Sequence, residues 1–121
     1  MSEALLLSDD LLFGSRVTGT AEALGLAVYS VRTADELLRQ AEVRRPACVL
    51  VDLHNPTLAI AEVVPALKAM GPVRVIAYGS HVEAATLRAA REAECDRVLP
   101  RSQFVEELPR ALVEWVSPLA S

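Results

Sequence analysis

The chain has 121 residues, of which 52% are apolar and 4% aromatic, with 12 Lys and Arg against 16 Asp and Glu. This size and composition predict one domain over residues 1–121 with an aliphatic core. The net charge of -4 argues against a nucleic-acid surface, which needs clustered cations, and no apolar run approaches the about 18 residues of a membrane span. The start lacks the basic region of a secretion signal. Cys48 and Cys95 lie at the edges of apolar runs, where free thiols behave as small hydrophobes, so we expect a cytoplasmic protein.

A short apolar run, a polar turn and a helical pattern recur five times along the chain. The predicted strands are 4–7, 27–31, 47–51, 73–78 and 97–99. The predicted helices are 11–24, 34–43, 59–70, 82–93 and 103–116. This alternation predicts an α/β fold with a parallel sheet and right-handed crossovers.

The composition of the strands predicts their order in the sheet. The first, third and fourth runs are nearly continuously apolar, which is typical of central parallel strands. The second run contains Ser30 and the fifth begins with Arg97, as edge strands often do. These features favour the order 2-1-3-4-5, which is that of a flavodoxin-like (βα)5 three-layer sandwich.

Several residues predict where helices begin, end or bend. Thr33 followed by Glu36 forms a capping box at the start of the second helix. Ser102 is a candidate cap for the last helix. Pro65 and Pro109 fall inside helical patterns, where each removes a hydrogen bond, so we expect a kink or a broken turn at both.

Three aspartates follow the first and third predicted strands. Asp9 and Asp10 come directly after the first run, and Asp52 ends the third. Parallel neighbours would bring these carboxylates to one edge of the sheet, where they favour a shared hard cation such as Mg²⁺. Alternatively, Asp10 caps the following helix and Asp52 is a solvated loop acid. His54 and His81 lie in loops at the same edge, so a transition-metal site is a further alternative.

Three segments together resemble the receiver domain of two-component response regulators over nearly the whole chain. Ser8-Asp9-Asp10 is similar to the acidic pair of that family. The segment from Asp52 to Pro56, with the sequence DLHNP, resembles its D-x-x-M-P motif, with Asn55 in place of Met. The segment CDRVLPRS at 95–102 resembles the stretch before the last helix of the family.

The resemblance implies a phosphorelay function. Asp52 would accept a phosphoryl group from a histidine kinase or a phosphotransfer protein, and Asp9, Asp10 and Asp52 would bind Mg²⁺ together with the backbone carbonyl of His54. The metal would neutralise the charge on the transferring oxygens.

The family also has a hydroxyl after the fourth strand and a Lys after the fifth, which contact the phosphoryl group and report its presence. Here Gly79 stands at the hydroxyl position, and Ser80 supplies a hydroxyl one residue later if the loop shifts. Arg101 stands at the Lys position and keeps the charge but not the geometry. Val98 replaces an aromatic residue that moves on activation. Phosphoryl acceptance rests on the aspartates, whereas the readout rests on the altered positions.

Three functions therefore stay open. The first is a stand-alone receiver, a phosphoprotein with no enzymatic activity beyond its own phosphorylation and dephosphorylation, present as a monomer or weak homodimer. It would signal through the fourth helix, fifth strand and fifth helix, a face with the charged residues Arg88, Arg91, Glu106, Glu107 and Arg110. The second is a pseudo-receiver that binds proteins without phosphorylation. The third is an unrelated small enzyme or a flavin carrier on the same sheet topology. The acidic first loop disfavours the flavin carrier because it would repel an unbridged phosphate.

Overall fold

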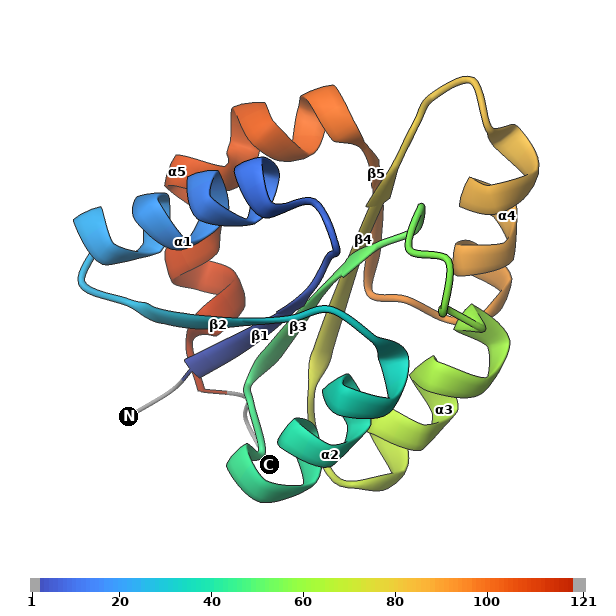
Figure 1. Ribbon diagram of the computed structural model, residues 1–121, viewed down its shortest axis with the longest axis horizontal. Helices are drawn as coiled ribbons and strands as arrows, with labels where there is room; N and C mark the ends of the chain where they lie inside the picture. The colour runs from blue at the N-terminus through green and yellow to red at the C-terminus, as the bar shows by residue number, and fades with distance from the viewer. Residues whose placement is uncertain (1–2, 119–121) are drawn as a thin grey trace.

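The computed structural model of the chain describes residues 3–118. A parallel sheet with the strand order β2-β1-β3-β4-β5 forms its centre (Figure 1). The strands are β1 (Glu3–Leu7), β2 (Ala27–Val31), β3 (Cys48–Asp52), β4 (Arg74–Gly79) and β5 (Arg97–Pro100). The predicted order and the flavodoxin-like fold class are confirmed, with the strands that contain Ser30 and Arg97 at the two edges.

Helices cover both faces of this sheet. They are α1 (Leu11–Ala23), α2 (Ala34–Arg44), α3 (Ile60–Ala69), α4 (Ala84–Glu92) and α5 (Arg101–Val116). Helices α1 and α5 pack on one face, and α2, α3 and α4 pack on the other (Figure 1). The observed bounds lie within two residues of the predicted ones. Within residues 3–118, each helix is too short or too polar to cross a membrane.

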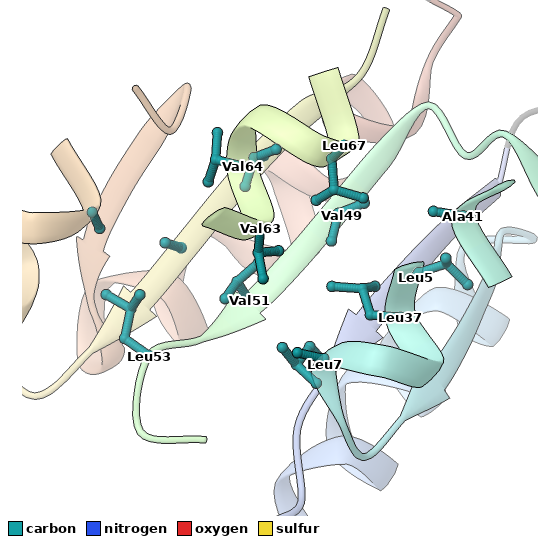
Figure 2. Close-up of a cluster of buried hydrophobic side chains, with 14 of the residues drawn as sticks. Leu5, Leu7, Leu37, Ala41, Val49, Val51, Leu53, Val63, Val64 and Leu67 are labelled. Atoms are coloured by element: carbon teal, nitrogen blue, oxygen red, sulfur yellow. The ribbon is translucent and has the colours of Figure 1, made fainter. Parts of the chain in front are cut away.

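The central strands are buried on both faces because alternate residues point to opposite sides. Leu5 and Leu7 of β1 and Val51 of β3 face α2 and α3, where Figure 2 shows them packed with Leu37 and Val63. The residues between them face α1 and α5. This two-sided burial fixes the strands, so the loops at their carboxyl ends have a rigid base.

The start of α2 confirms one predicted cap, and the start of α5 corrects another. The Thr33 side chain accepts a hydrogen bond from the Glu36 amide, as predicted for the start of α2. Ser102 does not cap α5, because the helix already begins at Arg101 and Pro100 stands at the cap position with no side-chain bond. Helices α3 and α5 continue through Pro65 and Pro109, so neither proline breaks its helix, and the predicted kink stays a prediction. Both prolines are exposed, where the carbonyl left without a partner can be hydrated.

Candidate functional site

Asp52 ends β3 at the carboxyl edge of the sheet with its side chain turned inward. Only 5% of the residue is exposed. Its Oδ1 accepts a hydrogen bond from the His54 amide at 2.9 Å, and its Oδ2 accepts one from the Ser8 hydroxyl at 3.2 Å. Both carboxylate oxygens are thus engaged by donors from the protein.

Ser8 connects Asp52 to the loop after β1. Its hydroxyl donates to Asp52 and accepts a hydrogen bond from the Asp10 amide at 3.1 Å. Ser8 is 4% exposed, so these bonds form away from bulk water, where an unpaired group would be costly. Ser8 was predicted only as part of the acidic motif, with no role of its own. The signal that could have predicted this role is its position in the sequence, between an apolar strand and two aspartates.

Asp10 caps α1, which confirms the alternative reading of this residue. Its Oδ1 accepts a hydrogen bond from the Phe13 amide at 3.0 Å, and its Oδ2 accepts one from Nη2 of Arg101 at 3.2 Å. The Phe13 amide, followed by the Arg101 guanidinium, lowers the pKa of the Asp10 carboxyl below its ordinary value of 3.8. Asp10 is therefore held as an anion with both oxygens in use.

Arg101 reaches this edge from the first turn of α5. Besides its bond to Asp10, the guanidinium carbon lies 4.1 Å from the centre of the Phe13 ring. This is a cation–π distance, and a planar guanidinium suits the contact better than an ammonium does. Arg101 was predicted to bring a positive charge to the site, and its side chain lies beside the acidic loop.

Asp9 and the His54 side chain point to solvent. Asp9 is exposed, and the His54 side chain is 83% exposed, with its Nδ1 3.9 Å from Glu83. Among residues 3–118, no three His, Cys, Asp or Glu side chains gather so that they could hold a metal ion. The transition-metal alternative with His54 and His81 is therefore not formed.

The predicted Mg²⁺ site is likewise not assembled in this arrangement of residues 3–118. Each oxygen of Asp10 and of Asp52 accepts one hydrogen bond from the protein. Each keeps a second lone pair that a cation could use, but a cation beside Asp10 would also meet the positive charge of Arg101. The binding of Mg²⁺ by Asp9, Asp10, Asp52 and the His54 carbonyl stays a prediction that requires these side chains to rearrange.

The loop after β4 lacks a hydroxyl directed at Asp52. Ser80 accepts a hydrogen bond from the Val82 amide at 3.4 Å, a local turn contact. Gly79 is buried, and a Cβ atom built on it would lie 3.3 Å from Cβ of Leu53. Close packing therefore leaves little room for a larger side chain at this position. The predicted role of Ser80 stays a prediction.

A polar latch, formed by Asn55 and Thr57, ties the loop after β3 to the start of α2. The side-chain Nδ2 of Asn55 donates a hydrogen bond to the Arg32 carbonyl at 2.9 Å. Its Oδ1 accepts hydrogen bonds from the backbone amide and the hydroxyl of Thr57, at 3.0 and 2.6 Å. The Thr57 hydroxyl in turn accepts a bond from the Ala34 amide at 3.0 Å. Asn55 is 4% exposed. Sequence reasoning noted Asn55 as a replacement for Met but missed this polar role.

A cluster of aromatic rings lies beneath the site. Tyr78 stacks on Phe104 at 4.3 Å between ring centres and contacts Phe13 at 5.1 Å. Burial raises the pKa of the Tyr78 phenol, and the nearby Asp52 charge raises it further. The nearby Ser8 hydroxyl lowers the pKa of the phenol in part, but this hydroxyl makes its hydrogen bonds with Asp52 and the Asp10 amide. Within the described residues, the buried Tyr78 hydroxyl has no hydrogen-bond partner.

The fold matches solved receiver domains. One from Bermanella marisrubri is 19% identical and has a TM-score of 0.81, with 97% of this chain and 100% of that chain covered. The receiver domain of a sensor histidine kinase from Pseudomonas aeruginosa, with a magnesium ion coordinated in its active-site cleft, is 23% identical, with a TM-score of 0.81 and coverage of 95% and 97%. The receiver domain of a Saccharomyces cerevisiae response regulator, crystallised with a histidine phosphotransfer protein, is 14% identical, with a TM-score of 0.80 and coverage of 95% and 88%.

No family model and no curated protein matches the chain. At these identities the structural likeness establishes the fold, and it confirms the predicted resemblance at that level. The chain has the receiver fold of response regulators.

Proposed function

We propose that this chain is a receiver-fold signalling module that binds a partner protein without Mg²⁺-dependent phosphorylation. The observation that carries the proposal is the engagement of the acidic edge by the protein itself. Arg101 pairs with Asp10, while Ser8 and the His54 amide take the two oxygens of Asp52. A site in this state has its negative charge partly neutralised without a bound ion.

The loops after β4 and β5 support the same proposal. A phosphorylation switch needs side chains that sense the new group and move. Gly79 offers no hydroxyl, Ser80 is used in a local turn, and Val98 is a partly buried aliphatic residue that packs in the core. These positions therefore lack the side chains that would sense a phosphoryl group on Asp52 and transmit the change to the surface.

The partner would bind the face formed by α4, β5 and α5. Arg88, Arg91, Glu106 and Arg110 are exposed there, whereas Glu107 is engaged by Arg97 and Gln103. A groove of about 510 Å³ runs along α5 and is lined by Ser102, Gln103, Glu106, Glu107, Arg110 and Ala111. Mixed charges of this kind suit a polar protein interface with a charged rim.

The second candidate is phosphoryl acceptance on Asp52 from a histidine kinase or a phosphotransfer protein, in a phosphorelay of the cytoplasm. Its support is the position of Asp52, a buried carboxylate at the carboxyl edge of the sheet beside Ser8. The likeness to receivers that bind magnesium or a phosphotransfer protein adds to it. In this case Asp52 would have to exchange its bonds to Ser8 and the His54 amide for bonds to the incoming group.

Beryllofluoride with Mg²⁺, a mimic of the phosphoryl group, separates the two candidates. The His54 amide donates directly to Asp52, so its nuclear magnetic resonance signal reports on any ligand there. The proposed function predicts no saturable shift of this signal at millimolar Mg²⁺. A saturable shift in the wild type that disappears in Asp52→Asn would establish the second candidate instead.

A further inference from the structure

Arg101 is held at the acidic edge by two contacts from one helix. Its Nη2 lies 3.2 Å from Oδ2 of Asp10, and its guanidinium carbon lies 4.1 Å from the centre of the Phe13 ring. Asp10 precedes α1 and Phe13 lies in its first turn. The start of α5 is thereby joined to the start of α1 through a single side chain.

The Phe13 ring is a fixed platform for this cation. Phe13 is 6% exposed, and its ring packs against Tyr78 at 5.1 Å and Phe104 at 6.1 Å between ring centres. A ring held in this way cannot turn aside without loss of core packing. The guanidinium is therefore placed by the core as well as by the charge of Asp10.

The charge at this edge favours a cation of some kind. Asp9, Asp10 and Asp52 contribute three carboxylates after two neighbouring strands. Arg101 supplies one positive charge, and a guanidinium does not lose its proton in proteins. Because Arg101 donates to one oxygen of Asp10 and the Phe13 amide donates to the other, an incoming divalent ion would have to bind beside the guanidinium against its positive charge, or displace it.

We propose that Arg101 is a built-in counter-cation that occupies Asp10 and keeps divalent metal ions from this edge. The inference rests on the proposed function and deepens it, because it names the residue that would make partner binding independent of Mg²⁺. It also gives a physical reason for arginine at a position where receivers carry lysine. A lysine could neutralise charge there, but its compact ammonium would lack the broad contact that the planar guanidinium makes with the Phe13 ring.

Removal of the guanidinium should open the site to metal. In Arg101→Ala, Oδ2 of Asp10 loses its donor and the edge loses a positive charge, so we expect affinity for Mg²⁺ and Mn²⁺ to rise about tenfold or more. Arg101→Lys keeps the charge but loses the stack, so it should lie between the wild type and Arg101→Ala.

The experiment is a titration of the wild type and of each variant with Mg²⁺ alone, monitored by calorimetry. A parallel titration with Mn²⁺ alone would detect paramagnetic broadening of the amides of residues 8–10 and 52–54. Arg97→Ala is the matched control, since Arg97 is also a partly exposed arginine in an ion pair, with Glu107. Circular dichroism would verify that each variant keeps the fold.

A gain of metal affinity in Arg101→Ala, with broadening at these amides and no such gain in Arg97→Ala, would support the proposal. An equal gain in both variants, or no gain in a folded Arg101→Ala, would overturn it. The two proposals fail separately. Binding of beryllofluoride by the wild type would refute the proposed function, whereas unchanged metal affinity in Arg101→Ala would refute the role of Arg101 alone.

Discussion

The two halves of the carboxyl edge are built differently. The loops after β1 and β3 are joined by buried hydrogen bonds through Ser8 and Asp52, and the second loop is fastened to α2 by Asn55. The loop after β4 makes a local turn contact through Ser80, and the start of α5 reaches the site by the exposed ion pair of Arg101. The acidic half is thus a rigid, internally satisfied structure, whereas the start of α5 meets it through the exposed side chain of Arg101.

The largest effect should come from breaking the latch in the rigid half. Asn55→Ala removes three hydrogen bonds at a residue that is 4% exposed. We expect the free energy of unfolding to fall by about 2–3 kcal/mol. Urea denaturation followed by circular dichroism measures it. Ser80→Ala in the other half should change this free energy by less than about 0.5 kcal/mol. Similar losses in both variants would remove the contrast between the halves.

Ser8→Ala should give the next largest loss. The variant lacks the donor to Asp52 and the acceptor for the Asp10 amide, and we expect a loss of about 1–2 kcal/mol in the free energy of unfolding. Ser15→Ala on the exposed side of α1 is the matched control. If the two variants unfold at the same urea concentration, the bridge through Ser8 is not a stabilising element.

Tyr78→Phe should stabilise the protein by up to about 1 kcal/mol, since it removes a buried hydroxyl that has no partner within residues 3–118. The ring contacts with Phe13 and Phe104 would remain. Thermal unfolding would measure the change, with Tyr29→Phe as a control because Tyr29 is 41% exposed. A clear loss of stability would mean that the phenol makes a hydrogen bond in solution.

The smallest effect concerns the charge of Asp10, because its pair with Arg101 is exposed and screened. The pKa of the Asp10 carboxyl is lowered in the folded state, so the unfolded chain takes up the proton first as the pH falls. The contribution of the Asp10 charge to the free energy of unfolding is complete above the ordinary pKa of 3.8. It is lost as the pH falls through the lowered folded-state pKa.

Asp10→Asn tests this contribution, because Asn keeps the cap and loses the charge. The variant should be less stable than the wild type near neutral pH, and the difference in urea midpoint should shrink in acid. A difference that stays constant across this range would show that the ion pair with Arg101 adds nothing to stability.

The strands, the helices and their order could be predicted from the sequence because they follow from local patterns. Ser30 and Arg97 marked the edge strands, and the apolar runs before Asp10 and Asp52 placed both acids at one edge. Prediction failed where a long-range contact decides the outcome. The bond between Arg101 and Asp10 spans 91 positions and depends on how one long side chain turns. Ser102 was misassigned as a cap because α5 begins at Arg101, two residues before the predicted start at 103, a shift that composition alone cannot resolve.

The most direct test of the account is a titration of the wild-type protein with Mg²⁺ alone, followed at the amides of Asp10 and His54. The Asp10 amide donates to the Ser8 hydroxyl and the His54 amide donates to Asp52. An ion that displaces these hydrogen bonds must therefore shift the signals of the two amides. The account predicts that neither signal shifts in a saturable way at millimolar Mg²⁺. A saturable shift that disappears in Asp52→Asn would contradict it and would mean that the acidic edge is a working metal site.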